Sequence, residues 1–363
     1  MNREILSKVF LVLAGILAFA GPAAGQSFGE RLTVNGFISQ AYGSAGDLPI
    51  FGLTTGGTAD YRALALQGRF AITSSDFIVV QVNHRALGSS ALGALDDDVE
   101  LAWGFYQKRI WGNSIRVGRV PMPRGIFNEI RNVGTILPFY RASKAFYSEG
   151  VETVDGVSLS RSFDLPGGFS ADAYAYGGAF DMRVEVITNL GMEAIEEPMS
   201  AAYGTQLWLN TPMAGVRLGG GAIRSTMDSA IKENQDFDMW SVSAEAVRDR
   251  YFVRGEYLKA AQANVLDYVG YYGQAGLNLW KGLWANFQAE WNTNTIKNLP
   301  LPFDLEVDAI QDYAYGVSYM VSPRLVIKGE YHQFEGYQFD VPVDMMGAPV
   351  DNDYFLISVA AAF

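Results

Sequence analysis

The sequence predicts an all-β protein: a transmembrane antiparallel β-barrel of 16 strands that follows a cleaved signal peptide. Three observations predict it. The N-terminus is an apolar run that ends in small residues. The rest of the chain consists of short segments in which apolar residues alternate with small or polar ones. The connections between these segments alternate between short and long.

Residues 1–25 have the parts of a secretory signal peptide. Arg3 and Lys8 supply positive charge, an uninterrupted apolar run of 12 residues follows, and Ala23-Ala24-Gly25 offers small residues for cleavage. That run is too short for a membrane helix, which needs ~18 apolar residues or more, and no later run reaches this length. We therefore expect cleavage before Gln26 and a single domain over 26–363.

Composition excludes several classes of protein. Charged residues make up 18% of the chain, below the roughly 25% of soluble domains. The net charge of −12 disfavours a nucleic-acid binder, which needs basic residues to neutralise phosphates. Because the chain has no cysteine and two histidines, disulfides, thiolate metal sites and cysteine nucleophiles are excluded. An exported soluble protein or a membrane barrel remains.

Alternation with period 2 is typical of strands with two different faces. It is clear over 98–106, 283–292 and 312–321. Apolar residues against small or polar ones fit a barrel with lipid outside and water inside, so Trp103 and Phe105 are expected to face lipid. A soluble sandwich with shorter strands would give a similar pattern and remains the alternative.

The alternation defines 16 segments in chain order. They are 31–42, 59–73, 76–86, 97–109, 113–120, 150–162, 168–179, 201–210, 213–225, 237–248, 251–261, 267–280, 283–294, 310–321, 324–335 and 352–363. Every second connection is short and nearly all the others are longer, as in outer-membrane barrels, which have short periplasmic turns and longer outer loops. This topology requires Met182 to Asn189 to lie in a long loop. If this segment formed a separate strand, every later strand would run in the opposite direction and the short and long connections would exchange ends.

The last strand closes on an aromatic residue, Phe363. A signal peptide, an all-strand mature chain and this closing strand resemble the porins of Gram-negative outer membranes, of the general diffusion or anion-selective type. The segments 117–125 (VGRVPMPRG) and 154–156 (VDG) are similar to a segment of some porin families, including anion-selective ones. The resemblance covers the mature chain by architecture.

The resemblance implies passive diffusion of small hydrophilic solutes through an outer-membrane channel. It also implies a homotrimer, contact with outer-membrane lipid and lipopolysaccharide, and Phe363 as the signal read by the barrel-assembly machinery. No cofactor, metal or enzymatic activity is implied.

The third long connection, at about 121–149, is the most distinctive stretch. In 16-strand porins the third loop folds into the barrel, and the resemblance implies the same here. Residues 116–144 carry six basic residues against one acidic residue, and basic rings favour anions in narrow pores. The candidate constriction residues are Arg116, Arg124, Glu129, Arg131, Arg141 and Lys144. Alternatively, these cations bind lipopolysaccharide phosphates or pair with acids on the barrel wall.

Elsewhere, the alternation places as many basic as acidic residues on the predicted lumen face. Candidate lumen residues include Arg69, Arg85, Arg217, Arg254, Glu290 and Glu330. Two other functions remain open. An outer-membrane lipase or protease would need a histidine base, but neither His84 nor His332 lies in a recognised catalytic pattern. A structural or adhesive barrel would bind a partner through its loops.

Overall fold

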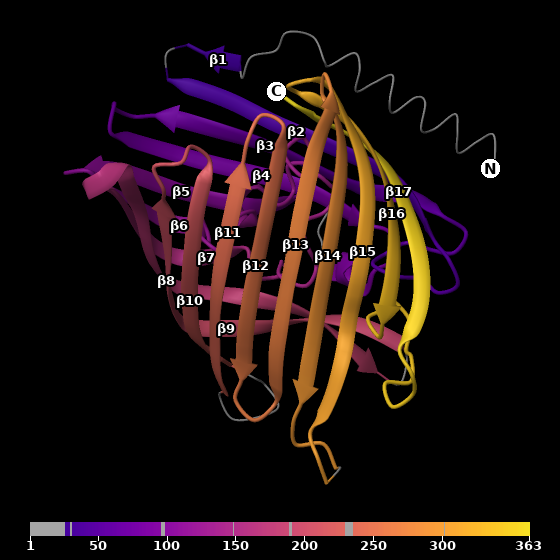
Figure 1. Ribbon diagram of the computed structural model, residues 1–363. Coiled ribbons are helices and arrows are strands. Elements are labelled where there is room, and N and C mark those ends of the chain that lie inside the picture. The colour runs from indigo at the N-terminus through magenta and orange to yellow at the C-terminus, as the bar shows by residue number, and fades with distance from the viewer. Residues whose placement is uncertain are drawn as a thin grey trace.

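The computed structural model describes residues 26–29, 31–95, 99–147, 149–188, 191–228, 235–300 and 302–363. The predicted signal peptide lies outside these residues. The described chain forms one antiparallel sheet in which β17 pairs with β2, so that 16 strands, β2 to β17, close into a barrel (Figure 1). The predicted all-β barrel of 16 strands is confirmed.

The 16 barrel strands, β2 to β17, agree with the predicted segments in number and order, and the short strand β1 has no counterpart among them. The strands are β1 Gln26–Phe28, β2 Leu32–Ala45, β3 Thr58–Ala71, β4 Asp76–Leu87, β5 Glu100–Ile110, β6 Asn113–Pro121, β7 Thr153–Leu165, β8 Phe169–Thr188, β9 Gly191–Asn210, β10 Val216–Met227, β11 Gln235–Val247, β12 Tyr251–Gln262, β13 Leu266–Trp280, β14 Leu283–Ile296, β15 Leu305–Ser322, β16 Leu325–Gly336 and β17 Val350–Ala362. Three short 3-10 helices, η1 Ala91–Leu95, η2 Asn128–Ile130 and η3 Pro166–Gly168, lie in the connections. Within the described residues there is no helix that could cross a membrane.

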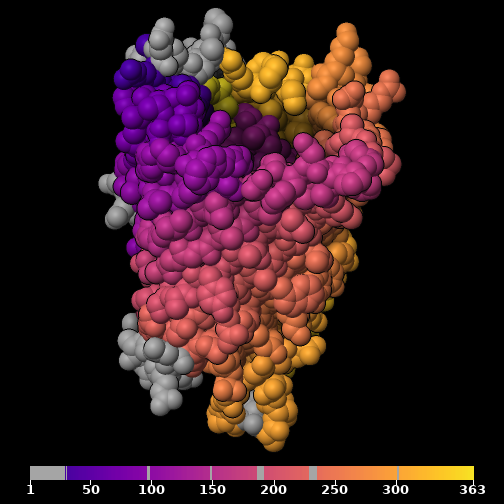
Figure 2. Space-filling model, turned by 90° about the vertical axis from the view of Figure 1, so that its left-hand side faces the viewer, coloured from indigo at the N-terminus to yellow at the C-terminus, as the bar shows by residue number. Residues whose placement is uncertain are grey.

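The barrel has two different ends. Short turns such as 111–112, 281–282 and 323–324 lie at one end, together with the C-terminus of β17 and the start of β2 (Figure 1). The longer connections lie at the other end. We call these the short-turn end and the long-loop end. Figure 2 shows an almost continuous wall of strands with a hollow at the short-turn end.

The two chain ends share one edge of β2. Residues 37–45 of β2 pair with β17, and residues 32–34 pair with the short strand β1. Between them, Gly36 and Phe363 exchange both backbone hydrogen bonds, at 3.1 and 2.9 Å. The closing strand therefore ends directly beside β1, and the Phe363 ring lies over Gly36, where an added Cβ would approach it to 2.5 Å.

The expectation that Met182 to Asn189 lies in a loop was wrong for Met182 to Thr188, and Asn189 lies outside the described residues. β8 and β9 are each 20 residues long and remain paired up to Thr188 and Gly191, with one irregularity between Gly178 and Phe180. A barrel strand needs only about 9–11 residues to cross a bilayer, so this hairpin extends beyond the wall. Because the segment continues β8 instead of forming a separate strand, the order of all later strands is preserved.

The orientation predicted for Trp103 and Phe105 was also wrong. Gln81 pairs with Trp103 and Val82 with Leu101, which leaves Ala102 as a β-bulge in β5. An extra residue in one strand reverses the faces beyond it. Leu101 accordingly is exposed on the outside, whereas Phe105 is buried and Trp103 packs against the interior core.

Elsewhere, large apolar side chains are exposed on alternate positions of the wall, for example Leu207, Val253 and Ile357. Outward apolar positions of this kind are expected where a barrel faces lipid. The main buried core lies inside the barrel, where residues of the β6–β7 connection pack against wall residues such as Tyr272 and Leu258.

Candidate functional site

The β6–β7 connection, residues 122–152, is the segment that fills the barrel interior, and we call it the inner segment. Apart from η2 it has no regular structure, in keeping with Pro123 and Pro138, which lack the N–H needed for strand pairing. Its Phe127, Phe139 and Phe146 side chains are almost completely buried. This burial anchors an irregular chain in the space that the strands enclose.

Three glutamates on alternate strands of the wall hold the backbone of the inner segment. Glu256 on β12 accepts the N–H of Ile126 at 3.0 Å, and Glu330 on β16 accepts the N–H of Tyr140 at 2.9 Å. Between them, Glu290 on β14 accepts the N–H of Ala145 at 3.2 Å and also the hydroxyl of Ser143. Because the three hydrogen bonds come from three separate strands, these glutamates fix the course of the segment at three points.

Two further contacts strengthen this attachment. Lys328, next to Glu330 on the same face of β16, donates to the carbonyl oxygen of Phe139 at 2.8 Å. Gly125 has a φ of +58°, and an added Cβ there would lie 2.6 Å from the Glu256 carboxylate. Residue 125 must therefore be glycine if the Glu256 carboxylate is to come this close to the backbone.

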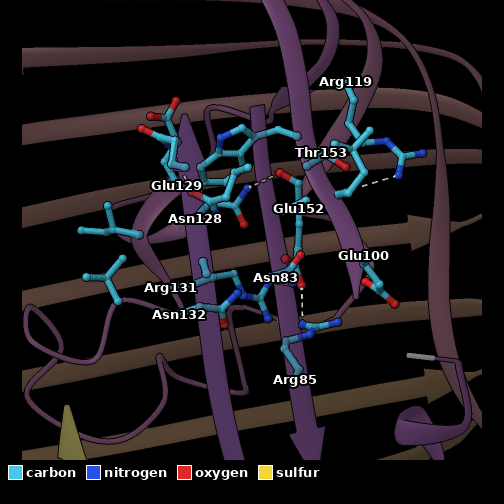
Figure 3. Close-up of a pocket in the computed structure, with 18 of the residues that line it drawn as sticks. Asn83, Arg85, Glu100, Arg119, Asn128, Glu129, Arg131, Asn132, Glu152 and Thr153 are labelled. Atoms are coloured by element: carbon cyan, nitrogen blue, oxygen red, sulfur yellow. Dashed lines mark hydrogen bonds and ion pairs between the residues drawn. The ribbon is translucent and has the colours of Figure 1, made fainter. Parts of the chain in front are cut away.

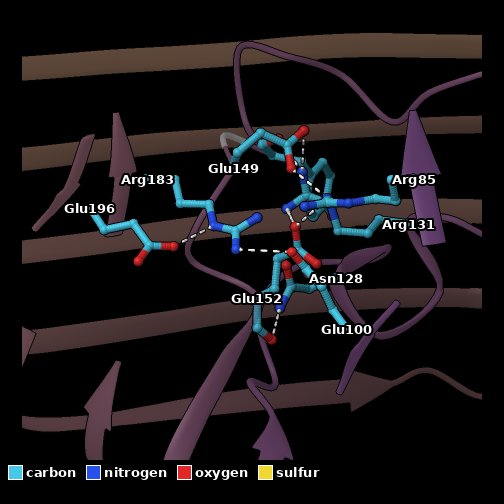
Figure 4. A network of polar contacts seen from close by, with 9 residues as sticks. Arg85, Glu100, Asn128, Arg131, Glu149, Glu152, Arg183 and Glu196 are labelled. Carbon is cyan, nitrogen blue, oxygen red and sulfur yellow. Dashed lines mark hydrogen bonds and ion pairs between the residues drawn. The ribbon is translucent and has the colours of Figure 1, made fainter. Parts of the chain in front are cut away.

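On the opposite wall an ion-pair cluster joins β4 to the inner segment (Figure 4). Arg85 of β4 contacts Glu149 at 2.9 Å and Glu152 at 3.1 Å. Arg131 contacts the same two carboxylates at 3.3 and 3.8 Å, and donates to the carbonyl oxygen of Tyr147 at 2.8 Å. We call Arg85, Arg131, Glu149 and Glu152 the ion-pair cluster.

Burial on its own would raise the pKa of Glu149, but the nearby guanidinium groups of Arg131 and Arg85 outweigh it and hold that pKa well below its ordinary value.

Next to the cluster, Arg183 of β8 bridges Glu100 of β5 and Glu196 of β9, at 3.3 and 3.0 Å. The long β8–β9 hairpin is thereby tied to the same wall.

The predicted constriction cations have different surroundings. Arg116 pairs with Glu129 at 3.5 Å and stacks over Phe105. Arg124 is 3% exposed, donates to the carbonyl oxygen of Phe146 at 3.1 Å, and lies among aromatic rings of the inner segment. Burial lowers the pKa of its guanidinium. Arg116 is therefore paired, whereas Arg124 is buried with no carboxylate partner among the described residues, and its Nε and Nη2 have no hydrogen-bond partner there.

Arg141 and Lys144 lie on the other side of the inner segment. Arg141 donates to the carbonyl oxygen of Phe51 and lies 4.8 Å from the centre of the Tyr61 ring. The Nζ of Lys144 lies 5.3 Å from the centre of the Phe51 ring. Among the described residues, no carboxylate lies within ion-pairing distance of either cation.

The remaining predicted lumen residues contribute to the wall. Arg217 of β10 and Arg254 of β12 both contact Glu245 of β11, at 2.5 and 3.1 Å. Arg69 of β3 stacks over Phe77 with its guanidinium 3.7 Å from the ring centre. His332 is buried 2.7 Å from Asp312, and His84 accepts a hydrogen bond from Arg62 at 2.9 Å. Within the described residues there is no cluster of potential metal ligands.

Two cavities lie on either side of the stretch 149–152. The first, of about 540 Å³, is bounded by residues 128–133 and by the wall, including Asn83, Arg85 and Arg119 (Figure 3). The second, of about 360 Å³, is bounded by β11 to β15 and the β8–β9 extension. Gly150 and Glu152 line the first cavity, whereas Glu149 and Val151 line the second.

A third cavity of about 40 Å³ shares residues with both. Arg85 and Arg131 also line the first cavity, and Lys144 and Glu149 also line the second. With Arg62, which is paired with Asp60, and Arg141, five basic side chains thus meet one carboxylate at the smallest of these three spaces. Sequence analysis missed Glu149 and Glu152, because the basic stretch was considered only up to residue 144; extending it to the next strand would have found both.

Comparisons with known proteins identify the fold. No family model matches the chain, and no curated protein matches it. Among solved structures, the Salmonella typhi OmpF complex with daunomycin is similar, with 13% identity over 92% of this chain and 97% of the other and a TM-score of 0.61.

Two further structures share this architecture. The outer membrane channel DcaP of Acinetobacter baumannii has 10% identity over 94% of this chain and 100% of the other, with a TM-score of 0.63. The anion-selective porin from Comamonas acidovorans has 12% identity over 92% and 99%, with a TM-score of 0.55. The chain therefore has the fold of the outer-membrane porins.

Proposed function

We propose that the protein is a channel of the Gram-negative outer membrane through which small hydrophilic solutes diffuse passively. The observation that carries this proposal is a closed barrel with cavities of about 540 and 360 Å³ on either side of an inner segment fixed to the wall. Barrels of 16–18 strands leave an aqueous channel, which the inner segment would narrow. The long-loop end would face the outside and the short-turn end the periplasm.

We further propose a preference for anions, set at the third cavity. Basic side chains in a narrow passage with low-dielectric walls attract anions. Glu149 and Glu152 offset Arg85 and Arg131, and Glu129 offsets Arg116. Arg141 and Lys144 are the cations that carry the preference, so we expect it to be moderate.

Export, assembly and location belong to the same proposal. Residues 1–25 would direct export and be removed, and Phe363 would be read by the barrel-assembly machinery. The mature barrel would contact outer-membrane lipid and lipopolysaccharide and, as the porin resemblance implies, form a homotrimer. Chemical cross-linking of the protein in isolated outer membranes, followed by mass measurement, tests the trimer.

Single-channel recording in a planar bilayer, with the reversal potential measured under a salt gradient, tests the channel. We expect stepwise openings and a reversal potential on the anion side. Lys144→Glu should move it toward cations, whereas Lys259→Glu, on the exposed outer face of β12, should leave it unchanged. Openings with cation preference would contradict the proposed anion preference but would leave the channel proposal standing. A folded barrel without openings would favour an enzymatic or adhesive barrel.

A further inference from the structure

The cavity of about 360 Å³ lies toward the long-loop end, which is at the bottom of Figure 1. We call it the upper cavity because this end is the one proposed to face the outside. Its wall is unusual. Along β11 the buried alternate positions near the short-turn end are Ser241 and Ser243, but toward the long-loop end they are Phe237 and Met239. The inside of a channel barrel is ordinarily polar. These apolar residues belong to the core that packs against the inner segment, but they also line an open cavity, which is unusual for the passage of hydrophilic solutes.

The same change occurs in the neighbouring strand. On β12 the inward positions pass from Arg254 and Glu256 to Leu258 and Ala260 toward the long-loop end. Val307 of β15 is buried on the same cavity. The apolar surface thus covers β11 and β12 and recurs on β15.

Other sides of the upper cavity add further apolar side chains, although Asn292 and Asn294 of β14 are polar. The β8–β9 extension contributes Met182 and Met192, and the β16–β17 connection contributes Phe339, Val341 and Met345. Methionine side chains are flexible and adapt to ligands of varied shape. A cavity of this volume lies within the roughly 300–1,000 Å³ of small-molecule sites.

One cation lines this apolar space without a partner. Among the described residues, Lys144 Nζ makes no hydrogen bond and no carboxylate contact, and its neighbour is the Phe51 ring at 5.3 Å. Three acids that act on it through space have other partners: Glu149 contacts Arg85 and Arg131, Glu185 accepts the hydroxyl of Ser90 at 3.0 Å, and Asp340 accepts the N–H of Gly52 at 2.6 Å. Lys144 is half-buried, and an anion placed beside a partly desolvated charge would offset the cost of its burial.

We propose that the upper cavity binds a water-soluble amphipathic monocarboxylate, with its apolar body against the β11–β12 wall and its carboxylate on Lys144. The remaining basic residue of the lining, Arg183, is already paired with Glu100 and Glu196, so a single negative charge fits the site better than a dianion. This binding goes beyond the proposed diffusion of hydrophilic solutes and does not require conduction.

Isothermal titration of the protein in lipid nanodiscs with octanoate tests the site, with empty nanodiscs as the reference. We expect saturable binding at one site per chain. Lys144→Met should weaken it at least tenfold, and Leu258→Gln should weaken it as well. Lys259→Met removes a lysine from the opposite face of the same strand and should leave binding unchanged.

Acetate and 1-octanol separate the two parts of the ligand. We expect neither to bind as tightly as octanoate, because acetate lacks the apolar body and 1-octanol lacks the charge. Octanoate binding that is absent from the folded barrel, or that survives Lys144→Met, would overturn the proposal. Because heat is measured and not current, failure here is distinct from failure of the channel proposal.

Discussion

The carboxylate of Glu330 on β16 accepts the backbone N–H of Tyr140 at 2.9 Å, which fixes the inner segment to the wall at a point 190 residues away in the chain. Glu256 and Glu290 make the equivalent contact from β12 and β14. The inner segment is therefore not a loosely packed loop. Its position depends on a few carboxylates of the wall, and this makes the arrangement testable.

Replacing Glu330 should loosen the inner segment. Glu330→Ala leaves the Tyr140 N–H buried without its acceptor, which costs about 1–3 kcal/mol of folding free energy. We expect lower thermal stability and a larger, noisier single-channel conductance. Glu306→Ala, on the exposed face of β15, is the matched control. Unchanged conductance and melting temperature would contradict the anchoring role.

Gly125→Ala should disturb the same attachment from the segment side. The new Cβ would lie 2.6 Å from the Glu256 carboxylate, and alanine at a φ of +58° is itself unfavourable. We expect Gly125→Ala to lower the thermal stability and to raise the single-channel conductance, as Glu330→Ala does. Gly93→Ala, where an added Cβ meets nothing within 4 Å, should change neither property. Equal behaviour of the two glycine variants would refute the argument.

The ion-pair cluster predicts how the channel responds to pH. The pKa of Glu149 lies well below its ordinary value of 4.5, so its ionised form stabilises the fold above that value. This contribution is lost only as the pH falls through the depressed pKa. We therefore expect Glu149 to contribute no change of the reversal potential from about pH 8 to about pH 5, whereas Asp340, whose pKa burial raises to about 6, titrates within this range in wild type and Glu149→Gln alike.

Glu149→Gln tests at constant pH whether Glu149 carries a negative charge that compensates the nearby arginines. Removing this negative charge leaves Arg85 and Arg131 less compensated, so the reversal potential should shift toward anions. Glu306→Gln again serves as the control. A titration of selectivity in wild-type protein between about pH 5 and 8, absent from Glu149→Gln, would show that Glu149 is not held in its ionised form.

The closing residue gives a prediction about assembly. Phe363→Ala keeps the two backbone hydrogen bonds to Gly36 but removes the ring. We expect refolding in detergent to be unaffected and the amount of folded, heat-modifiable barrel in the outer membrane to fall several-fold. Phe303→Ala, an exposed aromatic of the β14–β15 loop, should leave assembly intact. Normal assembly of the Phe363 variant would remove its role as a signal.

The strands could be predicted from sequence because the alternation of faces is a local property, read over a few residues. Prediction from this alternation failed where the backbone is irregular. The bulge at Ala102 reverses the side on which Trp103 lies, and a bulge depends on pairing with β4. Likewise, the strand character of Met182–Thr188 was present in its alternation, but only pairing with β9 shows that it continues β8.

The sequence by itself determined the closed barrel, its strand order and the basic character of the inner segment, because these follow from local pattern and composition. The tertiary structure decided which charges remain free. Arg131 lies with Arg85 and Glu149 because β4 and the inner segment meet inside the barrel, while Lys144 is left beside an apolar wall. Pairing of charges depends on distances of a few ångströms between residues far apart in the chain, which no local pattern encodes.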